Sequence, residues 1–495
     1  MNHGGGLEAS ASRALGRRQL IAGAGVAVMA AGLAACDSGG DERSEVTSSA
    51  GPDTSGAPAT ASPPSTTASA VTTASAPESS APAGGASAED EVKAIALFAT
   101  PLQNQFAAWA FEYVAEGADV GEIEAIANDV ASDDDAAYYD AWYEHATRHR
   151  AKAEEAEAQG KSRTALYHHL RAAVYASVSY KLLFGAPVDP RLATAFETQT
   201  TSFDRAMALI DPPAERLDVT LDGNQLVVYF LRAKDTAPGE PRPTIVMVNG
   251  YDASVSDMYL AMGLQALPRG YHVVLVDGPG QGALLVQDGV PMIAEWERVI
   301  GPVVDALVGR PDVDPARIVL QGWSLGGQLS LRGAAGEPRI AAVVSDPPAW
   351  SLYEQLEPAF VAFGLSPEAI ARLPEISDED LAKMEAGVNA NQRFYWIFVQ
   401  RGLWVNGATD LRDWLQKIAP FTLEGVSDGI ECPVLGTFAD RDPLAAGAQA
   451  TLDRLNAPTT LLPFSAAEGA GGHQETLNRA LAETLILDWL DETLA

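Results

Sequence analysis

The stretch that decides the fold is Ile318-Val319-Leu320-Gln321-Gly322-Trp323-Ser324-Leu325-Gly326-Gly327. An apolar run typical of a buried strand leads into a Gly-x-Ser-x-Gly turn, and the QLSLRGAAG that follows predicts a helix. This order is typical of a nucleophile elbow, in which Ser324 occupies a sharp turn with its hydroxyl exposed. A glycine-rich turn with an incidental serine is the alternative, because a five-residue pattern also arises by chance.

A nucleophilic serine of this kind needs a base and an acid later in the chain. His473, in EGAGGHQETLNRA, is the only histidine after Ser324 and is therefore the predicted base. The acid is expected in PVLGTFADRDPLA, where a strand ends and two aspartates follow. Asp440 is preferred because it is closer to the end of the strand. Asp442 is the fallback, and Asp346, after AAVVS, is a weaker third candidate.

The chain after Pro213 alternates strand-like with helix-like stretches, which predicts an α/β fold with a mostly parallel sheet flanked by helices. The predicted strands are residues 217–221, 225–233, 243–250, 272–278, 317–322, 341–346, 433–439 and 459–464. The first two are expected to form an antiparallel hairpin around Asp222-Gly223-Asn224. The strand at 243–250 runs into a turn at about the place where folds with a nucleophile elbow have their second oxyanion donor, and this similarity implies that the backbone N–H groups of Tyr251 and Leu325 bind the oxyanion.

Composition divides the chain into four segments. We expect a targeting signal at residues 1–35 and a Ser/Thr/Pro/Ala-rich disordered tether at 36–88. An all-helical domain is expected at 89–213, where apolar residues recur three and four apart, and the α/β domain at 214–495. Within the latter, an aromatic-rich insert at about 348–428 is expected to form a helical lid. Its aromatic residues serve as lid core or as the wall of an apolar pocket, and either role favours a substrate with an apolar or aromatic part.

The N-terminus carries two export features. Arg17-Arg18 before a short apolar run resembles a bacterial twin-arginine signal, and Leu33-Ala34-Ala35-Cys36 resembles a lipobox. Cys36 is therefore the predicted lipidation site, and a lipid on it would anchor the protein to the membrane. We expect export to the cell envelope, on the outer face of the bacterial cytoplasmic membrane. The alternative is a short uncleaved anchor.

Charge and composition bear on the partners. A formal net charge of -33 argues against nucleic acid, whose phosphates need a basic face. His145 and His149 lie four apart and share a helical face, but without an HExxH pattern a metal site is not expected there. We therefore predict a small-molecule substrate, no metal and no cofactor, and leave a homodimer open.

The stretches VMVNGYDAS, VDGPGQG, GWSLGG, GTFADRD and GGH together resemble the α/β hydrolases that have a helical N-terminal domain. That branch includes 2,6-dihydropseudooxynicotine hydrolase and the fermentation–respiration switch-like esterases. The resemblance covers about residues 90 to 495 and implies a cleft between the helical domain and the hydrolase core. It also implies that an acidic residue at the position of Asp252 contacts substrate in members that cleave carbon–carbon bonds, although a glutamate is usual there.

Three functions follow from these features. The first is a serine hydrolase acting on a carbonyl substrate, an ester in the first instance. The second is a hydrolase of a carbon–carbon bond in a ketone or diketone, for which Asp252 is the distinguishing residue. The third is a surface-tethered binding protein on a hydrolase scaffold, a role that would need none of Ser324, the aspartate or His473.

Overall fold

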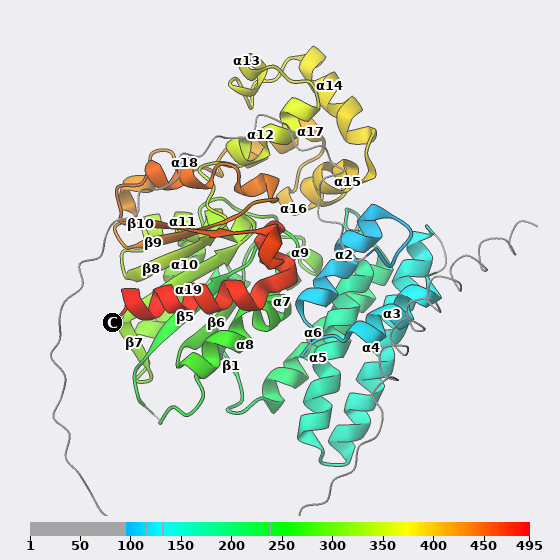
Figure 1. Ribbon diagram of the computed structural model, residues 1–495, viewed down its shortest axis with the longest axis vertical. Coiled ribbons are helices and arrows are strands. Elements are labelled where there is room, and N and C mark those ends of the chain that lie inside the picture. The colour runs from blue at the N-terminus through cyan, green and yellow to red at the C-terminus, as the bar shows by residue number, and fades with distance from the viewer. Residues whose placement is uncertain (1–95, 115, 131–132, 238) are drawn as a thin grey trace, which may run out of the picture. The chain divides into compact units, whose positions relative to one another are not determined.

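Residues 96–114, 116–130, 133–237 and 239–495 are described in a computed structural model of the chain (Figure 1). They all belong to one compact unit. The predicted signal at 1–35, the tether at 36–88 and Cys36 lie outside the described residues and stay predictions. None of the helices in the described ranges is long and apolar enough to cross a membrane.

An eight-stranded sheet forms the centre of this unit, in the order β1-β4-β6-β5-β7-β8-β9-β10. Strands from β6 to β10 in this order pair in parallel, whereas β4 pairs antiparallel with both β1 and β6. The strands are β1 (Glu215–Arg216), β4 (Val227–Leu231), β5 (Arg242–Val248), β6 (His272–Asp277), β7 (Val313–Trp323), β8 (Ile340–Asp346), β9 (Val434–Ala439) and β10 (Thr459–Phe464). The predicted mostly parallel sheet is confirmed.

The predicted hairpin is present and continues into the main sheet. β2 (Thr220–Leu221) and β3 (Asn224–Gln225) pair antiparallel at its tip. Bonds from Leu217 N–H to the Val228 carbonyl and from Leu226 N–H to the Val219 carbonyl continue the same register to β1 and β4. Asp222 and Gly223 both have positive φ, 52° and 84°, as a two-residue hairpin turn of the primed type requires.

Helices cover both faces of the sheet (Figure 1). On one face α10 (Glu297–Val308) and α11 (Leu325–Gly336) pack against each other and against β7. On the other, α19 (Arg479–Thr493) packs against the π-helical η2 (Tyr259–Gly263) and α8 (Leu264–Ala266). Shorter helices are α7 (Val255–Met258), η3 (Leu267–Arg269), α9 (Gly282–Val286), η5 (Ser427–Gly429), η6 (Pro443–Ala445), α18 (Ala448–Asp453), η7 (Ala466–Glu468) and η8 (His473–Asn478).

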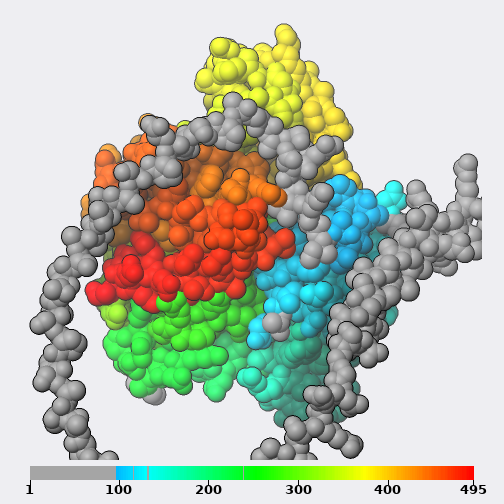
Figure 2. All heavy atoms as spheres, viewed as in Figure 1, coloured from blue at the N-terminus to red at the C-terminus, as the bar shows by residue number. Residues whose placement is uncertain are grey.

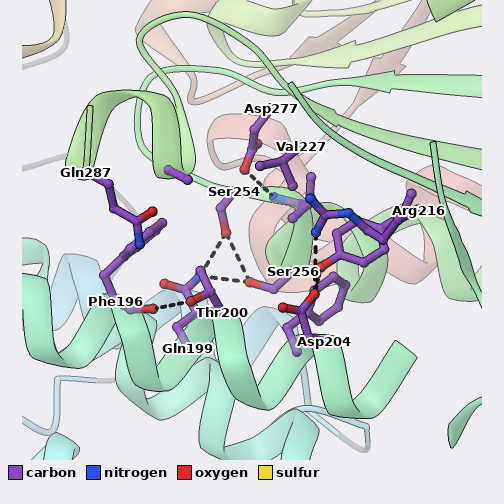
Figure 3. Close-up of a pocket in the computed structure, with 14 residues that line it drawn as sticks. Phe196, Gln199, Thr200, Asp204, Arg216, Val227, Ser254, Ser256, Asp277 and Gln287 are labelled. Carbon is purple, nitrogen blue, oxygen red and sulfur yellow. Dashed lines mark hydrogen bonds and ion pairs between the residues drawn. The ribbon is translucent and has the colours of Figure 1, made fainter. Parts of the chain in front are cut away.

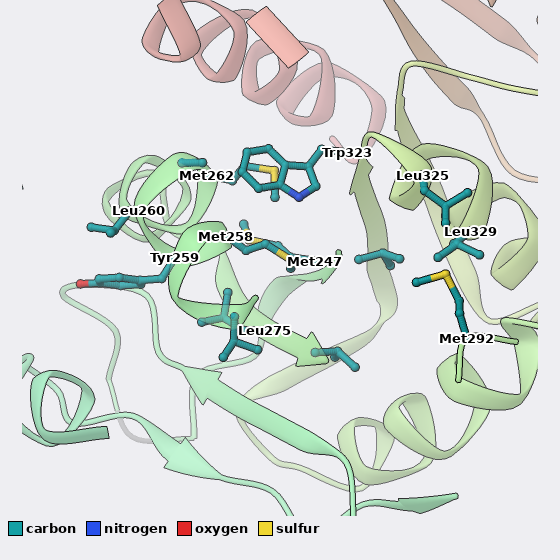
Figure 4. Close-up of a cluster of buried hydrophobic side chains, with 14 of the residues drawn as sticks. Met247, Met258, Tyr259, Leu260, Met262, Leu275, Met292, Trp323, Leu325 and Leu329 are labelled. Carbon is teal, nitrogen blue, oxygen red and sulfur yellow. The ribbon is translucent and has the colours of Figure 1, made fainter. Parts of the chain in front are cut away.

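The apolar core follows from the continuous apolar runs of the strands. The inner strands β6 and β8 are buried over nearly their whole length, as expected for strands covered on both faces. Figure 4 shows part of this core, in which side chains from β5 and β6 (Met247, Leu275) and from α7 and η2 (Met258, Met262) gather around the end of β7. The core therefore fixes the strand end at which Ser324 begins its turn.

The N-terminal helices are α2 (Pro101–Glu112), α3 (Val120–Asp129), α4 (Asp135–Ala158), α5 (Ser162–Tyr180), η1 (Lys181–Leu183) and α6 (Pro190–Leu209). Asp119, Asp134 and Asp189 cap α3, α4 and α6 by accepting a first-turn N–H. Gln199 of α6 donates to Ser254 at the start of α7, so the helical segment is bonded to the segment after β5. Helix α2 also packs against η8, and Figure 2 shows the two meeting at the surface, blue against orange-red.

The insert between β8 and β9, at about residues 348–428, consists of helices. It contains α12 (Leu352–Ala362), α13 (Pro367–Ile370), α14 (Asp378–Asn389), α15 (Gln392–Phe394), π-helical η4 (Tyr395–Arg401), α16 (Gly402–Asn406) and α17 (Leu411–Ile418). Its aromatic rings largely pack on one another: Phe398 makes edge-on contacts with Phe363 and Trp414, with ring centroids 5.3 and 5.2 Å apart. Trp396 stacks on Phe184 of the helical segment at 5.5 Å. These rings are core, which was one of the two roles expected for them.

Candidate active site

Ser324 lies on a strained turn between β7, which ends at Trp323, and α11, which begins at Leu325. Its φ of 55° and ψ of -129° are rare for a residue with a side chain. Close backbone approaches explain the flanking glycines. A Cβ on Gly322 would lie 2.0 Å from the carbonyl oxygen of Gly326, and one on Gly326 would lie 2.3 Å from that of Val248. The sequence pattern therefore marks a true elbow, in which both glycines are required sterically.

Ser324, His473 and Asp442 form a hydrogen-bonded row. His473 Nδ1 donates to Asp442 Oδ2 at 2.7 Å, so Nε2 is left to accept from Ser324 Oγ at 3.0 Å. The Asp442 side chain is 2% exposed and that of His473 is 34% exposed. Ser324 is half-buried. The row thus has a buried end at Asp442 and a partly exposed end at His473 and Ser324.

Asp440 was the preferred partner of His473, but in the structure the carboxylate that contacts His473 belongs to Asp442, the fallback. Asp440 is exposed, and its Oδ1 accepts from the backbone N–H of Ala466 at 3.0 Å. The chain turns directly after β9, with the N–H of Asp442 donating to the carbonyl of Ala439, so the second aspartate points inward. Asp442 also caps η6 through Leu444 N–H. Proximity to the strand end was the wrong criterion, because the turn decides which carboxylate faces inward.

His473 has a pKa above its ordinary value. Burial acts to lower this pKa, but the charge of Asp442 and its hydrogen bond outweigh burial, and Asp346 and Asp252 add to the increase. The stabilised cation is the form that His473 takes after it accepts a proton. The surroundings of His473 therefore favour its protonated form.

The predicted oxyanion donors flank Ser324. A Cβ on Gly250 would lie 3.0 Å from Ser324 Cβ and 3.3 Å from the backbone nitrogen of Leu325, so the loop after β5 passes directly over the elbow. Within the described ranges, neither the N–H of Tyr251 nor that of Leu325 donates to another residue. The Leu325 N–H also lies at the positive end of α11. Both groups remain available to an oxygen that gains negative charge.

The loop after β5 is held in place by side chains for which the sequence pattern predicted no role. Gln281 Nε2 donates to the carbonyls of Asn249 and Gly250 at 2.8 and 3.1 Å. Asn249 Nδ2 donates to the carboxylate of Asp277 at 3.1 Å, and Asn249 Oδ1 accepts from Gly250 N–H at 2.7 Å. Gln281 is the polar residue of the glycine-rich GPGQG stretch, and this is the feature of the sequence that could have pointed to its role. The structure thus uses this stretch to brace the backbone over Ser324.

Asp252 is paired with the insert. Both oxygens of its carboxylate accept from Arg401 Nη1 at 3.0 and 2.8 Å, and both side chains are largely buried. Tyr251 is tied to the same insert through Asn406, at 3.4 Å. Lys181 donates to the Asp252 carbonyl from the helical segment, and burial lowers its pKa. Asp252, predicted as a substrate-binding residue, thus joins three parts of the chain.

A cavity of about 250 Å³ lies between α6 and the start of α7 (Figure 3). Gln199, Ser254, Ser256 and Asp277 form its polar wall. Burial raises the pKa of Asp277 to about 7, although the hydrogen bond from Asn249 opposes the shift. No member of the Ser324 row lines this cavity. Gln199 donates to both of the serines, and Asp277 accepts from Asn249 and from Val255 N–H, so these polar groups already have partners.

The histidines of the helical segment pair with each other and with acids. His149 lies 3.2 Å from Glu122 and its Nδ1 lies 2.9 Å from that of His168, whereas His145 lies 3.9 Å from Asp129. Across the part of the chain that the structure describes, no three His, Cys, Asp or Glu residues are placed to hold a metal ion.

Comparison with known proteins gives matches of two kinds. The sequence matches the model of the alpha/beta hydrolase family over residues 245–483 and that of FrsA-like esterases over residues 125–355. Hydrolase LUC6 of a Fusarium species is 30% identical over 395 residues, which cover 76% of this chain and 92% of that protein. The 20-hydroxy-prefusarin hydrolase FUS2 of Gibberella moniliformis is 29% identical over 401 residues, or 77% of this chain and 93% of the relative.

Solved structures agree with the fold. The crystal structure of 2,6-dihydroxy-pseudo-oxynicotine hydrolase superposes with a TM-score of 0.61 at 21% identity, covering 78% of this chain and 95% of that one. The predicted fold, a mostly parallel sheet flanked by helices, is therefore confirmed. With a glycine-flanked serine on an elbow and relatives that match along most of their length, the chain belongs to the α/β-hydrolase family and is a hydrolase.

Proposed function

We propose that the protein is a serine hydrolase of carboxylic esters, with Ser324 as nucleophile, His473 as base and Asp442 as the orienting acid. The observation that carries the proposal is the row itself, with Nε2 to Oγ at 3.0 Å and Nδ1 to Oδ2 at 2.7 Å. Those distances lie within hydrogen-bond reach for proton transfer. The proposal also includes a substrate with an apolar or aromatic part, and its only support is the aromatic-rich composition of the insert.

The geometry supports a two-step reaction. His473 Nε2 takes the proton of the Ser324 hydroxyl as Oγ attacks the carbonyl carbon, and the N–H groups of Tyr251 and Leu325 receive the resulting oxyanion. The oxyanion collapses to an acyl-enzyme, and the alcohol leaves with the proton from His473. Water then loses a proton to His473 and attacks the acyl carbon, which releases the acid and restores Ser324. Asp442 holds the Nδ1–H tautomer throughout.

Cleavage of a carbon–carbon bond is the second candidate, and it depends on Asp252 contacting substrate. Because both of its carboxylate oxygens accept from Arg401, Asp252 is already occupied, which favours the ester. Purified protein given nitrophenyl esters and, separately, β-diketones is expected to turn over the esters at least 100-fold faster by kcat/KM, about the discrimination that a few kcal/mol of transition-state contact supplies. Faster turnover of the diketones would reverse the assignment.

A purely binding role does not account for the site. A binding protein needs neither a strained serine nor a buried carboxylate aligned with a histidine, whereas all three side chains stand within hydrogen-bond distance of the next. The hydrolase relatives support the same choice.

A fluorophosphonate probe tests the proposal without knowledge of the substrate. It is expected to label Ser324 in folded protein, because the probe reacts with serines activated by a neighbouring base. Only neutral His473 can accept the proton, and the pKa of His473 is raised, so the labelling rate should rise with pH through a midpoint above that of a free histidine. Peptide mapping that finds no label on Ser324, or a rate independent of pH between 5 and 9, would sink the proposal.

A further inference from the structure

A buried arginine lies beside the turn that follows His473. Arg479, at the start of α19, is 2% exposed and meets three carboxylates that are each 1% exposed or less. Its Nη1 donates to Asp346 and, at 3.2 Å, to Glu475, while its Nη2 donates to Glu483 at 2.6 Å. Nothing in the proposed reaction uses these four groups. Such a cluster is costly to bury, so its geometry calls for an explanation.

One of these carboxylates belongs to a residue that braces the elbow. The carbonyl oxygen of Asp346 accepts from the N–H of Ser324 at 2.6 Å. Its Oδ1 accepts from Thr437 Oγ1 at 2.7 Å, and Thr437 is in β9, the strand that leads to Asp442. Asp346 therefore contacts the chain segments that carry two members of the row. Arg479 contacts the segment that carries the third member, His473.

Arg479 reaches the third member through the backbone. Its Nη1 donates at 3.0 Å to the carbonyl of Gln474, the residue after His473. Gln474 and Glu475 both have positive φ, 59° and 52°, which is unfavourable for residues with side chains. Two consecutive left-handed residues persist only where their surroundings hold them. The contacts from Arg479 to the carbonyl of one and the carboxylate of the other do so.

The charges around Arg479 are consistent with a role in fixing the turn after His473. Three carboxylates surround one guanidinium, and burial acts against the charged form of two of them. Burial raises the pKa of Glu475 well above its ordinary value, with Asp346 adding to the effect, and burial also raises that of Glu483. Asp346 pairs with Arg479, whose pKa is raised by Asp346 and Glu483 against the opposing effect of burial.

We propose that Arg479 is a positioning residue, which holds His473 over Ser324 by joining Asp346 to the left-handed turn at Gln474 and Glu475. This inference rests on the proposed function, since it concerns the same base. A guanidinium is suited to the role because it donates in a fixed fork to several acceptors at once, whereas an ammonium is a point charge.

The test compares Arg479→Lys with Glu483→Gln in the full chain. Lysine keeps the charge but cannot span Asp346 and the Gln474 carbonyl together, so we expect fluorophosphonate labelling of Ser324 to slow on the order of 100-fold, as for a displacement of about 1 Å. Glu483→Gln removes a carboxylate from the same cluster, but one that accepts from Arg479 Nη2 and Gln321 Nε2 and does not touch the His473 turn. It should lower the thermal midpoint and leave the labelling rate within about twofold of wild type.

The pH profile separates positioning from loss of stability. The acidic groups that act on His473 are Asp442, Asp346 and Asp252, the last in its pair with Arg401, and Glu475 acts in turn on Asp346 and Asp442. If Arg479→Lys lets the ring move away from Asp442, the raised pKa is lost and the acid limb of labelling moves to lower pH. Glu483→Gln should not move it.

Two results would overturn this inference: a labelling rate for Arg479→Lys equal to wild type, or equal slowing in both variants. If Arg479→Lys does not fold, Asp346→Asn breaks the same ion pair, and about tenfold slower labelling is expected from the loss of one charge-assisted contact; an unchanged rate would again overturn it. Failure of the wild-type protein to label at Ser324 would instead contradict the proposed function.

Discussion

Replacing Ser324 by alanine is expected to lower kcat toward nitrophenyl esters by on the order of 10⁶-fold, as for removal of the nucleophile from a serine hydrolase. The change deletes one oxygen and should leave the fold intact. The elbow depends on the backbone at Gly322 and Gly326 and on the bond from the N–H of residue 324 to the Asp346 carbonyl, which alanine retains. Steady-state kinetics with a thermal melt of each protein measures both effects.

Ser330→Ala is the matched control. Ser330 is also on α11, is fully buried and donates to the carbonyl of Gly327, so its removal costs about 1 kcal/mol of stability through one hydrogen bond. Its activity should remain within about twofold of wild type, because surface and core changes away from the site act on stability. A Ser324→Ala protein that kept more than about a hundredth of wild-type activity would contradict the assignment of the nucleophile.

Sequence alone predicted those features that depend on neighbours in the chain. The elbow at Ser324 is encoded by glycines two positions away on either side, and the structure shows why each is required. His473 followed from elimination, since no other histidine comes later. The hairpin turn at Asp222-Gly223 was also predicted from residues that are neighbours in the chain.

Features that depend on distant partners could not be predicted. Arg401 and Asp252 are 149 positions apart, and Arg479 and Asp346 are 133 apart, so nothing in either local pattern pairs them. The choice between the two aspartates after β9 failed for a related reason. It depends on a turn whose direction is set by bonds from Arg441 to Gly471 and from Ala466 to Asp440, and these lie in a loop far along the chain.

Exchanging each of these aspartates for asparagine separates them functionally. Asp442→Asn is expected to lower kcat by about 10⁴-fold, because an amide in place of the carboxylate favours the wrong histidine tautomer and cannot stabilise the imidazolium. The asparagine oxygen can still accept from Leu444 N–H and cap η6, so the fold should persist. Asp440→Asn should leave kcat within about twofold, since the exposed side chain keeps an oxygen for the Ala466 N–H and does not touch His473.

The pH dependence of Asp442→Asn gives a second, independent readout. The charge and hydrogen bond of Asp442 raise the pKa of His473 against the effect of burial, so their loss should bring that pKa down. Because neutral His473 is the active base, the acid limb of kcat/KM should move to lower pH even as the maximum falls, whereas Asp440→Asn should keep the wild-type limb. The reverse pattern, a large loss in Asp440→Asn and little change in Asp442→Asn, would show that the carboxylate that orients His473 in solution is the other one. In that case the turn after Ala439 would have to open, breaking the bond from Asp442 N–H to the Ala439 carbonyl.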